Sequence, residues 1–169
     1  WMEVVPAQNW SDTAKLDLYW DLRHTESKND RLGVKLKGSI PQVPYTLAYL
    51  NTGYPCMNEK QLAMGETTIV GRKELRNPKG LFHIEDLQGI ALQRCSTARE
   101  AVLLMGRLAE QYGYRDGGEC LTVADKRELW FFEITGAGSE DMGALWVARR
   151  IPDDHVTDSA NTPRISDVD

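Results

Sequence analysis

Apolar residues recur at helical spacing in two stretches near the middle of the chain. The first stretch contains Ile84, Leu87, Ile90 and Ala91, in which each residue follows an earlier one by three or four positions. The second begins at Thr97 with Glu100 three residues later, the spacing of a capping box. Its apolar stripe is Ala98, Ala101, Val102, Met105, Leu108, Ala109 and Tyr112, and Gly113 follows it. Such a stripe indicates an amphipathic helix, and glycine commonly ends one. We therefore predict two consecutive helices.

Shorter runs rich in β-branched and aromatic residues lie on both sides of these helices and predict strands. A polar turn at Asn58–Lys60 and another at Asp125–Glu128 each join two such runs into a hairpin. Gly65 falls inside one run, which suggests a β-bulge or a close backbone approach. The predicted strands are Glu3–Ala7, Tyr45–Leu50, Leu62–Val70, Cys120–Ala124, Leu129–Ile134, Ala144–Arg149 and Val156–Ala160.

The region before Tyr45 has a weaker pattern. Ser11 or Asp12 is a suitable N-cap, and a helix after it would carry four larger side chains on one face. Those side chains are Leu16, Tyr19, Trp20 and Arg23. The polar stretch His24–Arg31 predicts an exposed loop, and Pro41 and Pro44 exclude a helix around them.

Strands, then two helices, then strands predict an α+β fold in which helices pack on an antiparallel sheet. The order of the elements does not follow the βαβ pattern of a parallel nucleotide-binding sheet, and no glycine-rich phosphate loop is present in the sequence. The length of 169 residues indicates one domain, or part of one.

Composition narrows the function classes. The 20 basic and 25 acidic residues give a net charge of −5, which argues against nucleic acid and against a membrane surface as partners. The three cysteines are widely spaced, which argues against a disulfide scaffold and a cysteine-rich zinc site. A reducing, cytoplasmic location fits this cysteine usage, and we expect no cofactor and no bound metal.

Few residues are, by themselves, candidates for a catalytic or metal-binding role. Cys56 lies in a turn, where either an accessible thiol or a small space-filling residue is expected, and Cys95 and Cys120 are expected to be buried. The sequence Asp153-Asp154-His155 resembles a metal-binding group, but a solvated turn after Pro152 explains it more simply. No spacing of serine, histidine and aspartate indicates a catalytic triad.

A polar cluster and one asparagine are stronger candidates for a substrate site. Glu66, Thr67 and Thr68 end a predicted strand, so they would contact either a substrate or solvent. Asn161 follows Ser159-Ala160, and its amide could donate to a developing oxyanion or simply form a turn. From these residues alone, the chain is an α+β domain with an undetermined activity.

Longer motifs resemble a known family. The run from Gly53 to Thr68, GYPCMNEKQLAMGETT, is similar to the signature of the N-terminal-nucleophile (Ntn) cysteine dipeptidases, the dipeptidase A and secernin group. Four further stretches also match that group, so that the resemblance covers nearly the whole chain. These stretches are Ile84–Leu87, Cys95–Ala101, Asp116–Cys120 and Ala148–Val156 with Ser159-Ala160-Asn161.

The resemblance implies an αββα sandwich and a mechanism. In this family the first residue of the mature chain is a cysteine, whose thiol attacks the scissile amide while its own α-amine acts as the base. Asn161 falls where the wider superfamily has an oxyanion asparagine, and Thr68 falls where relatives have a second oxyanion contact, with Glu66 and Thr67 beside it. Glu66 could also pair with the α-amine of a dipeptide.

The sequence departs from this pattern at its start, because Trp1 is no nucleophile and no cysteine maps onto the N-terminal one. The resemblance therefore implies that residues 1–169 form a single partial Ntn-hydrolase-like domain, incomplete at the N-terminus and inactive alone. Its partners would be a short peptide substrate and the missing N-terminal segment or a second copy. The alternatives are a non-catalytic, secernin-like binding protein and an amidase of the bile-salt hydrolase or penicillin acylase type.

Overall fold

The computed structural model describes residues 2–20 and 35–166. The chain divides into two compact units, residues 9–46 and residues 1–8 with 47–169. The larger unit is built on an antiparallel sheet that contains seven of the described strands, in the order β1-β6-β7-β8-β9-β10-β11. Their bounds are β1 (Glu3–Val5), β6 (Tyr49–Asn51), β7 (Met57–Asn58), β8 (Ala63–Val70), β9 (Gly118–Ala124), β10 (Leu129–Gly136) and β11 (Ala144–Ile151).

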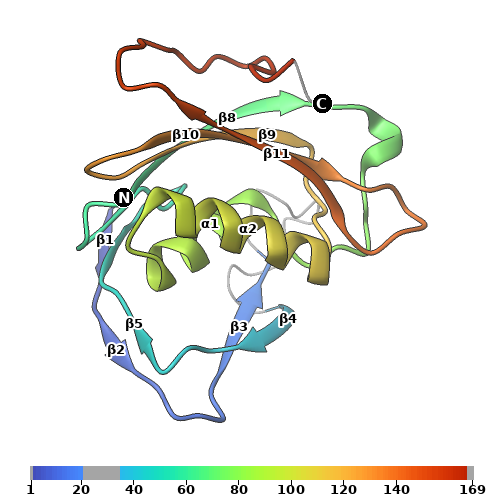
Figure 1. The fold of residues 1–169 in the computed structure, drawn as a ribbon. Coiled ribbons are helices and arrows are strands. Elements are labelled where there is room, and N and C mark those ends of the chain that lie inside the picture. Colours follow the sequence, from blue (N-terminus) through green and yellow to red (C-terminus); the bar gives the residue numbers. More distant parts are fainter. Residues whose placement is uncertain (1, 21–34, 167–169) are drawn as a thin grey trace. The chain divides into compact units, whose positions relative to one another are not determined.

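Two helices, α1 (Ile84–Arg94) and α2 (Ala98–Tyr112), cover one face of this sheet (Figure 1). A short 3-10 helix, η2 (Lys73–Leu75), precedes them. The predicted capping box is confirmed, because the Thr97 side chain accepts from the Glu100 backbone and Glu100 reaches back. The apolar stripe of α2 is buried apart from the half-buried Tyr112. The predicted arrangement of helices on an antiparallel sheet is therefore correct.

The contact between α2 and the sheet depends on Gly106. A Cβ atom at this position would lie 2.3 Å from Cε2 of Trp146 on β11, which is closer than real side chains approach. The indole ring of Trp146 thus lies directly against the helix backbone, and it also contacts Phe132 with ring centroids 5.6 Å apart. Gly106 allows this close packing, which the sequence pattern did not reveal.

The opposite face of the sheet is partly covered by the chain after β11 (Figure 1). Here Cys120, Phe131 and Ile165 form a buried cluster with Ile69, Val147 and Ile151 around it. The predicted strand Val156–Ala160 is wrong, because these residues follow the sheet without joining it. Side chains and not a backbone ladder hold this segment, and Val156 is fully exposed.

The smaller unit contains β3 (Lys15–Tyr19) and β4 (Leu36–Pro41), which pair antiparallel. The helix predicted from Leu16, Tyr19, Trp20 and Arg23 is therefore wrong where the structure describes it. Leu16 and Leu18 alternate with polar neighbours, and Leu18 is buried. Apolar side chains therefore repeat every two residues, as in a strand, and not at the helical spacing. The predicted loop His24–Arg31 and Arg23 itself lie outside the described residues. Strand β2 (Gln8–Asn9) pairs with β5 (Tyr45–Thr46).

Two other local predictions need correction. The predicted strand Tyr45–Leu50 is divided into β5 and β6. The hairpin predicted around the turn Asn58–Lys60 has an additional strand, because β7 lies between β6 and β8 in the sheet. Gly65 pairs regularly with Thr122 and has open space around its Cβ position, so it marks neither a bulge nor a close approach. The irregularity in β8 lies between Thr68 and Val70.

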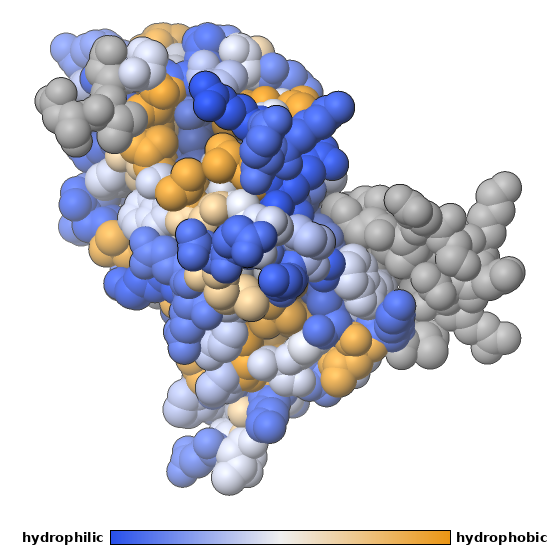
Figure 2. Space-filling view, turned by 90° about the vertical axis from the view of Figure 1, so that its right-hand side faces the viewer, coloured by the Kyte–Doolittle hydropathy of each residue, from blue (hydrophilic) through white to orange (hydrophobic). Residues whose placement is uncertain are grey.

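The described surface is mixed. On the side that Figure 2 shows, apolar side chains form several separate patches with polar side chains between them. Of the helices in the described residues, none has the length and apolar character required to cross a membrane.

Candidate functional site

The three polar residues of β8 point to different faces of the sheet, because successive side chains of a strand alternate. Thr67 pairs with Cys120 on the neighbouring strand β9, and Thr68 pairs with Glu119. Glu66 and Thr68 therefore share the face that carries the helices, and Thr67 faces the other way. The structure thus separates a cluster that is continuous in the sequence.

On the helix face, Glu66, Thr68 and Glu119 form a hydrogen-bonded group. The Thr68 hydroxyl donates to Oε1 of Glu66 at 3.2 Å. Glu119 is only 5% exposed. The pKa of Glu119 is raised to about 9, chiefly by burial and then by the hydrogen bond with Glu66 and the charge of Glu66. Glu119 is therefore protonated at neutral pH, so it donates to Glu66.

The same buried region contains Tyr114, whose side chain is fully buried. Burial raises the pKa of Tyr114, and so do the nearby carboxylates, including Glu119 and Glu66. The half-buried Glu66 and Thr68 thus lie at the edge of this buried region.

On the opposite face, Thr67 anchors the chain after β11. Its hydroxyl oxygen lies 2.7 Å from that of Ser159. Ser159 also donates to Sγ of Cys120 at 3.7 Å. Side chains from β8 and β9 thus hold one end of the segment Ser159–Ile165, which we call the anchored segment.

Glu133 on β10 holds the other end of the anchored segment. Its carboxylate oxygen Oε1 accepts from the backbone N–H groups of Arg164 and Ile165, and Glu133 is 6% exposed. Hydrogen bonds from two N–H groups to one buried carboxylate are stronger than neutral ones. The carboxylate therefore fixes the backbone just after Pro163.

Asn161 lies between these two anchors and is exposed. Within residues 2–20 and 35–166, its side chain makes no hydrogen bond. The amide is thus available to a ligand, while the backbone on both sides is fixed to the sheet. The anchored segment shares a face with Thr67, and Glu66 and Thr68 lie on the other side.

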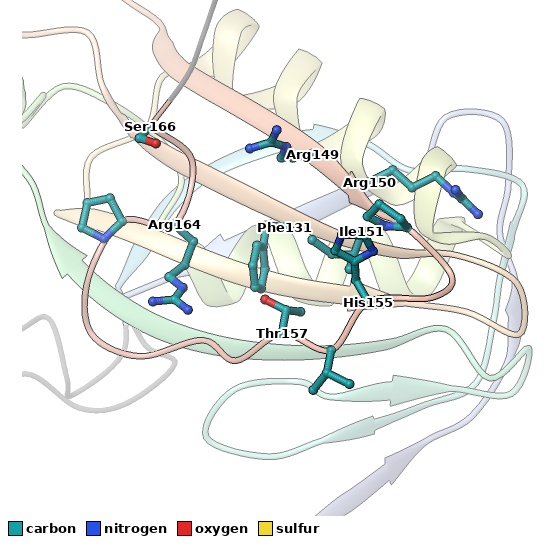
Figure 3. A pocket seen from close by; sticks show the side chains of 11 residues that line it. Phe131, Arg149, Arg150, Ile151, His155, Thr157, Arg164 and Ser166 are labelled. Atoms are coloured by element: carbon teal, nitrogen blue, oxygen red, sulfur yellow. The ribbon is translucent and has the colours of Figure 1, made fainter.

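A pocket of about 500 Å³ opens between β10, β11 and the chain that follows β11. Figure 3 shows this chain curving around the opening, with Phe131 and Arg149 on the strands and Arg164 on the anchored segment. The pocket is lined by Phe131, Arg149, Arg150, Ile151, Pro152, His155, Val156, Thr157, Pro163, Arg164 and Ser166.

The two buried cysteines do not have the environment of a nucleophile. Cys95 and Cys120 are buried as predicted, and burial raises the pKa of both thiols, that of Cys95 to about 12. A reactive thiol requires a lowered pKa. Cys56 is a free, half-buried cysteine.

The acidic turn with His155 is a local pair, since Nδ1 of His155 lies 2.8 Å from Oδ1 of Asp154. In the part of the chain that the structure describes, no group of three or more histidines, cysteines and carboxylates is arranged to hold a metal ion.

Sequence reasoning missed the residues that position the candidate site. Glu133 carries a signal that could have revealed it, because it is an acidic residue inside the apolar run Leu129–Ile134. Ser159 and Arg149 carry no comparable signal, since polar residues at strand ends and in loops are common.

An α+β fold with an exposed amide fixed beside a basic pocket is compatible with a hydrolase that binds a polar substrate. Comparison with known proteins gives the class directly: residues 46–169 match the model of peptidase family C69. The chain belongs to this family, as the resemblance predicted.

Several curated relatives are dipeptidases by name. A probable dipeptidase of Latilactobacillus sakei is 31% identical over 121 residues, which are 67% of this chain and 24% of the relative. A probable dipeptidase A of Streptococcus pyogenes serotype M1 is 35% identical over 111 residues, 62% of this chain and 22% of the relative. Dipeptidase A of Lactobacillus helveticus is 29% identical over 124 residues, 72% of this chain and 24% of the relative. The chain thus spans about a quarter of the length of these relatives.

Proposed function

We propose that this chain is part of a cysteine-type dipeptidase that hydrolyses the amide bond of short peptides. The observation that carries the proposal is the match of residues 46–169 to peptidase family C69, together with relatives that are named dipeptidases. The exposed Asn161 on a segment fixed at both ends supports it, because a hydrolase requires a donor held in place before the reaction.

The proposed fold is the αββα sandwich of Ntn hydrolases. A sheet with helices on one face, as in the larger unit, is one half of such a sandwich. In this proposal residues 1–169 belong to one partial domain, and the two compact units are subdivisions of it. The face that carries Thr67 and the anchored segment would then turn toward the second sheet.

The proposed nucleophile is an N-terminal cysteine thiol outside these 169 residues. None of the chain's own cysteines is assigned this role, because two are buried with raised pKa values and the third, half-buried beside β7, is far from the anchored segment in sequence. The 169 residues alone are therefore expected to be inactive.

In the proposed reaction the thiolate attacks the amide carbonyl and forms a C–S bond. The carbonyl oxygen becomes an oxyanion, which the Asn161 amide stabilises by donating a hydrogen bond. The C–N bond then breaks, the α-ammonium of the nucleophile gives its proton to the leaving amine, and water hydrolyses the resulting thioester.

The geometry divides the roles proposed for β8. Thr67 shares a face with the anchored segment, so we assign it to the substrate wall and to the fixing of Ser159. Glu66 and Thr68 are hydrogen-bonded to each other, and Glu66 also to Glu119, on the helix face of the sheet. Because this face is opposite the anchored segment, we assign Glu66 and Thr68 to the positioning of β8.

Dipeptide hydrolysis by a longer polypeptide that carries this chain after an N-terminal cysteine tests the proposal. Asn161→Ala should lower kcat by about 100- to 1000-fold, the usual effect of losing one oxyanion donor. Asn9→Ala, which changes another exposed asparagine, is the matched control. Equal activities of the two variants would refute the role of Asn161.

The substrates used in the same assay distinguish the alternatives. Hydrolysis of bile-acid or penicillin amides in place of dipeptides would make the protein an amidase. Binding of peptides without turnover of any amide would make it a scaffold and would refute the dipeptidase proposal.

A further inference from the structure

The lining of the pocket beside the anchored segment contains three arginines and one histidine. Two of the arginines have carboxylate partners: Arg150 lies 2.6 Å from Asp153 and 3.5 Å from Glu128, and Arg164 lies 2.6 Å from Asp158. His155 lies 2.8 Å from Asp154. The third arginine, Arg149, is exposed and forms no ion pair or hydrogen bond with any residue that the structure describes.

Arg149 lies over an apolar floor. It is the direct cross-strand neighbour of Phe131, which is 4% exposed and belongs to the buried cluster on this face. Phe131 places apolar surface beside the exposed guanidinium group, so a ligand that pairs with Arg149 can also bury an organic group there. The unpaired charge and the apolar floor together favour an anionic ligand with an organic body.

The pocket and Asn161 share one stretch of chain. Pro163 and Arg164 line the pocket, and Asn161 lies two residues before Pro163. Glu133 fixes the backbone at Arg164, so the pocket wall and the candidate donor are held by the same anchor. A volume of about 500 Å³ is within the usual range for small-ligand sites.

We infer that this pocket binds the C-terminal carboxylate of a peptide substrate, with Arg149 as the ligand of that carboxylate. The inference rests on the proposed dipeptidase function and goes beyond it by assigning the specificity determinant. The carboxylate of a dipeptide is one residue away from the scissile amide. A guanidinium fork that binds it in a bidentate manner would therefore select substrates by their length at the C-terminal side.

Binding of the dipeptide Ala-Ala and of its C-terminal amide tests the inference without any turnover. Both ligands are titrated by calorimetry into the longer polypeptide whose N-terminal cysteine is replaced by alanine. Arg149→Met should weaken binding of the acid about tenfold or more and leave binding of the amide unchanged. Arg127→Met, in the exposed turn before β10, is the matched control and should change neither. Arg149→Lys keeps the charge and should lose part of the affinity, because an ammonium group cannot form the bidentate contact.

Each outcome has a definite meaning. Equal affinity of the unchanged protein for acid and amide, or equal effects of Arg149→Met and Arg127→Met, would overturn the inference. Displacement of the dipeptide by inorganic phosphate at equal concentration would also overturn it, since the pocket would then be a general anion site. If the acid binds through Arg149 but the enzyme with its intact cysteine cleaves no dipeptide, the proposed function fails and the binding site remains.

Discussion

Replacing Glu119 by glutamine should stabilise the fold. Glu119 is buried between the sheet and the helices, and burial together with Glu66 raises its pKa to about 9. At neutral pH it is a neutral acid that donates to Glu66. A glutamine side chain has almost the same shape and also donates from its amide. The substitution therefore keeps the hydrogen bond and removes the need to take up a proton on folding.

The magnitude follows from the linkage between proton binding and folding. In the unfolded chain Glu119 loses its proton near its ordinary pKa of 4.5, whereas in the folded protein it keeps the proton up to about pH 9. Between these values the folded state binds one more proton, so the free energy of unfolding decreases by about 1.4 kcal/mol per pH unit as the pH rises. At pH 7 this loss amounts to about 3 kcal/mol, which Glu119→Gln should recover in large part.

Urea denaturation between pH 5 and pH 9 measures this effect. The unchanged protein should lose stability with rising pH across this window, and Glu119→Gln should have a slope smaller by about 1.4 kcal/mol per pH unit. Glu74→Gln changes an exposed glutamate and serves as the control. If Glu119→Gln and Glu74→Gln have the same slope, Glu119 is ionised in the folded protein, and the argument from burial is refuted.

Three further predictions concern packing, capping and thiol exposure. Gly106→Ala should destabilise the protein by about 1–3 kcal/mol, because the new Cβ would overlap the Trp146 ring. Gly89→Ala is the matched control, because the atom nearest to its new Cβ would be 3.7 Å away. In the same urea assay it should stabilise α1 by about 0.5–1 kcal/mol. Asp125→Ala should cost about 1–2 kcal/mol, because the carboxylate accepts from the first N–H of α2 and from two N–H groups of the β9–β10 turn; unchanged urea midpoints would contradict this. In the native protein, iodoacetamide should label Cys56 before the two buried cysteines, and mass spectrometry that finds equal labelling of all three would contradict their burial.

The helices and the central strands could be predicted from the sequence because each has a local signal. The capping box at Thr97 and the stripe of α2 follow from spacing alone, and the β9–β10 hairpin follows from two apolar runs around a polar turn. Residues 15–19 contain both periods: Leu16 and Tyr19 suit a helix, and Leu16 and Leu18 suit a strand. Pairing of Leu16 with Ile40 on β4 decides between them, and a contact at this separation has no local signature.

The candidate site was predicted only in part for the same reason. The motif that contains Glu66, Thr67 and Thr68 led to the family, but a motif does not state which side chain faces which side of a sheet. Strand alternation supplies that information once the strand's bounds and partners are known. Glu133 and Ser159 are far from the motif in sequence, and they belong to the site only because the chain after β11 returns across β8, β9 and β10.

The two faces of strand β8 therefore have different roles, although both come from one short motif. On the helix face, the half-buried Glu66 and Thr68 form a polar group with the buried Glu119, whose raised pKa lowers stability at neutral pH. On the other face, Thr67 with Ser159 and Glu133 fixes the segment that carries Asn161. A change on the helix face should alter stability and its pH dependence, because Glu66 and Thr68 are linked to the buried, protonated Glu119. A change on the other face should alter the position of Asn161 and of the Arg164 end of the pocket, because Thr67 and Glu133 hold the two ends of one segment. The continuous run Glu66-Thr67-Thr68 is thus expected to behave in mutagenesis as two independent sets.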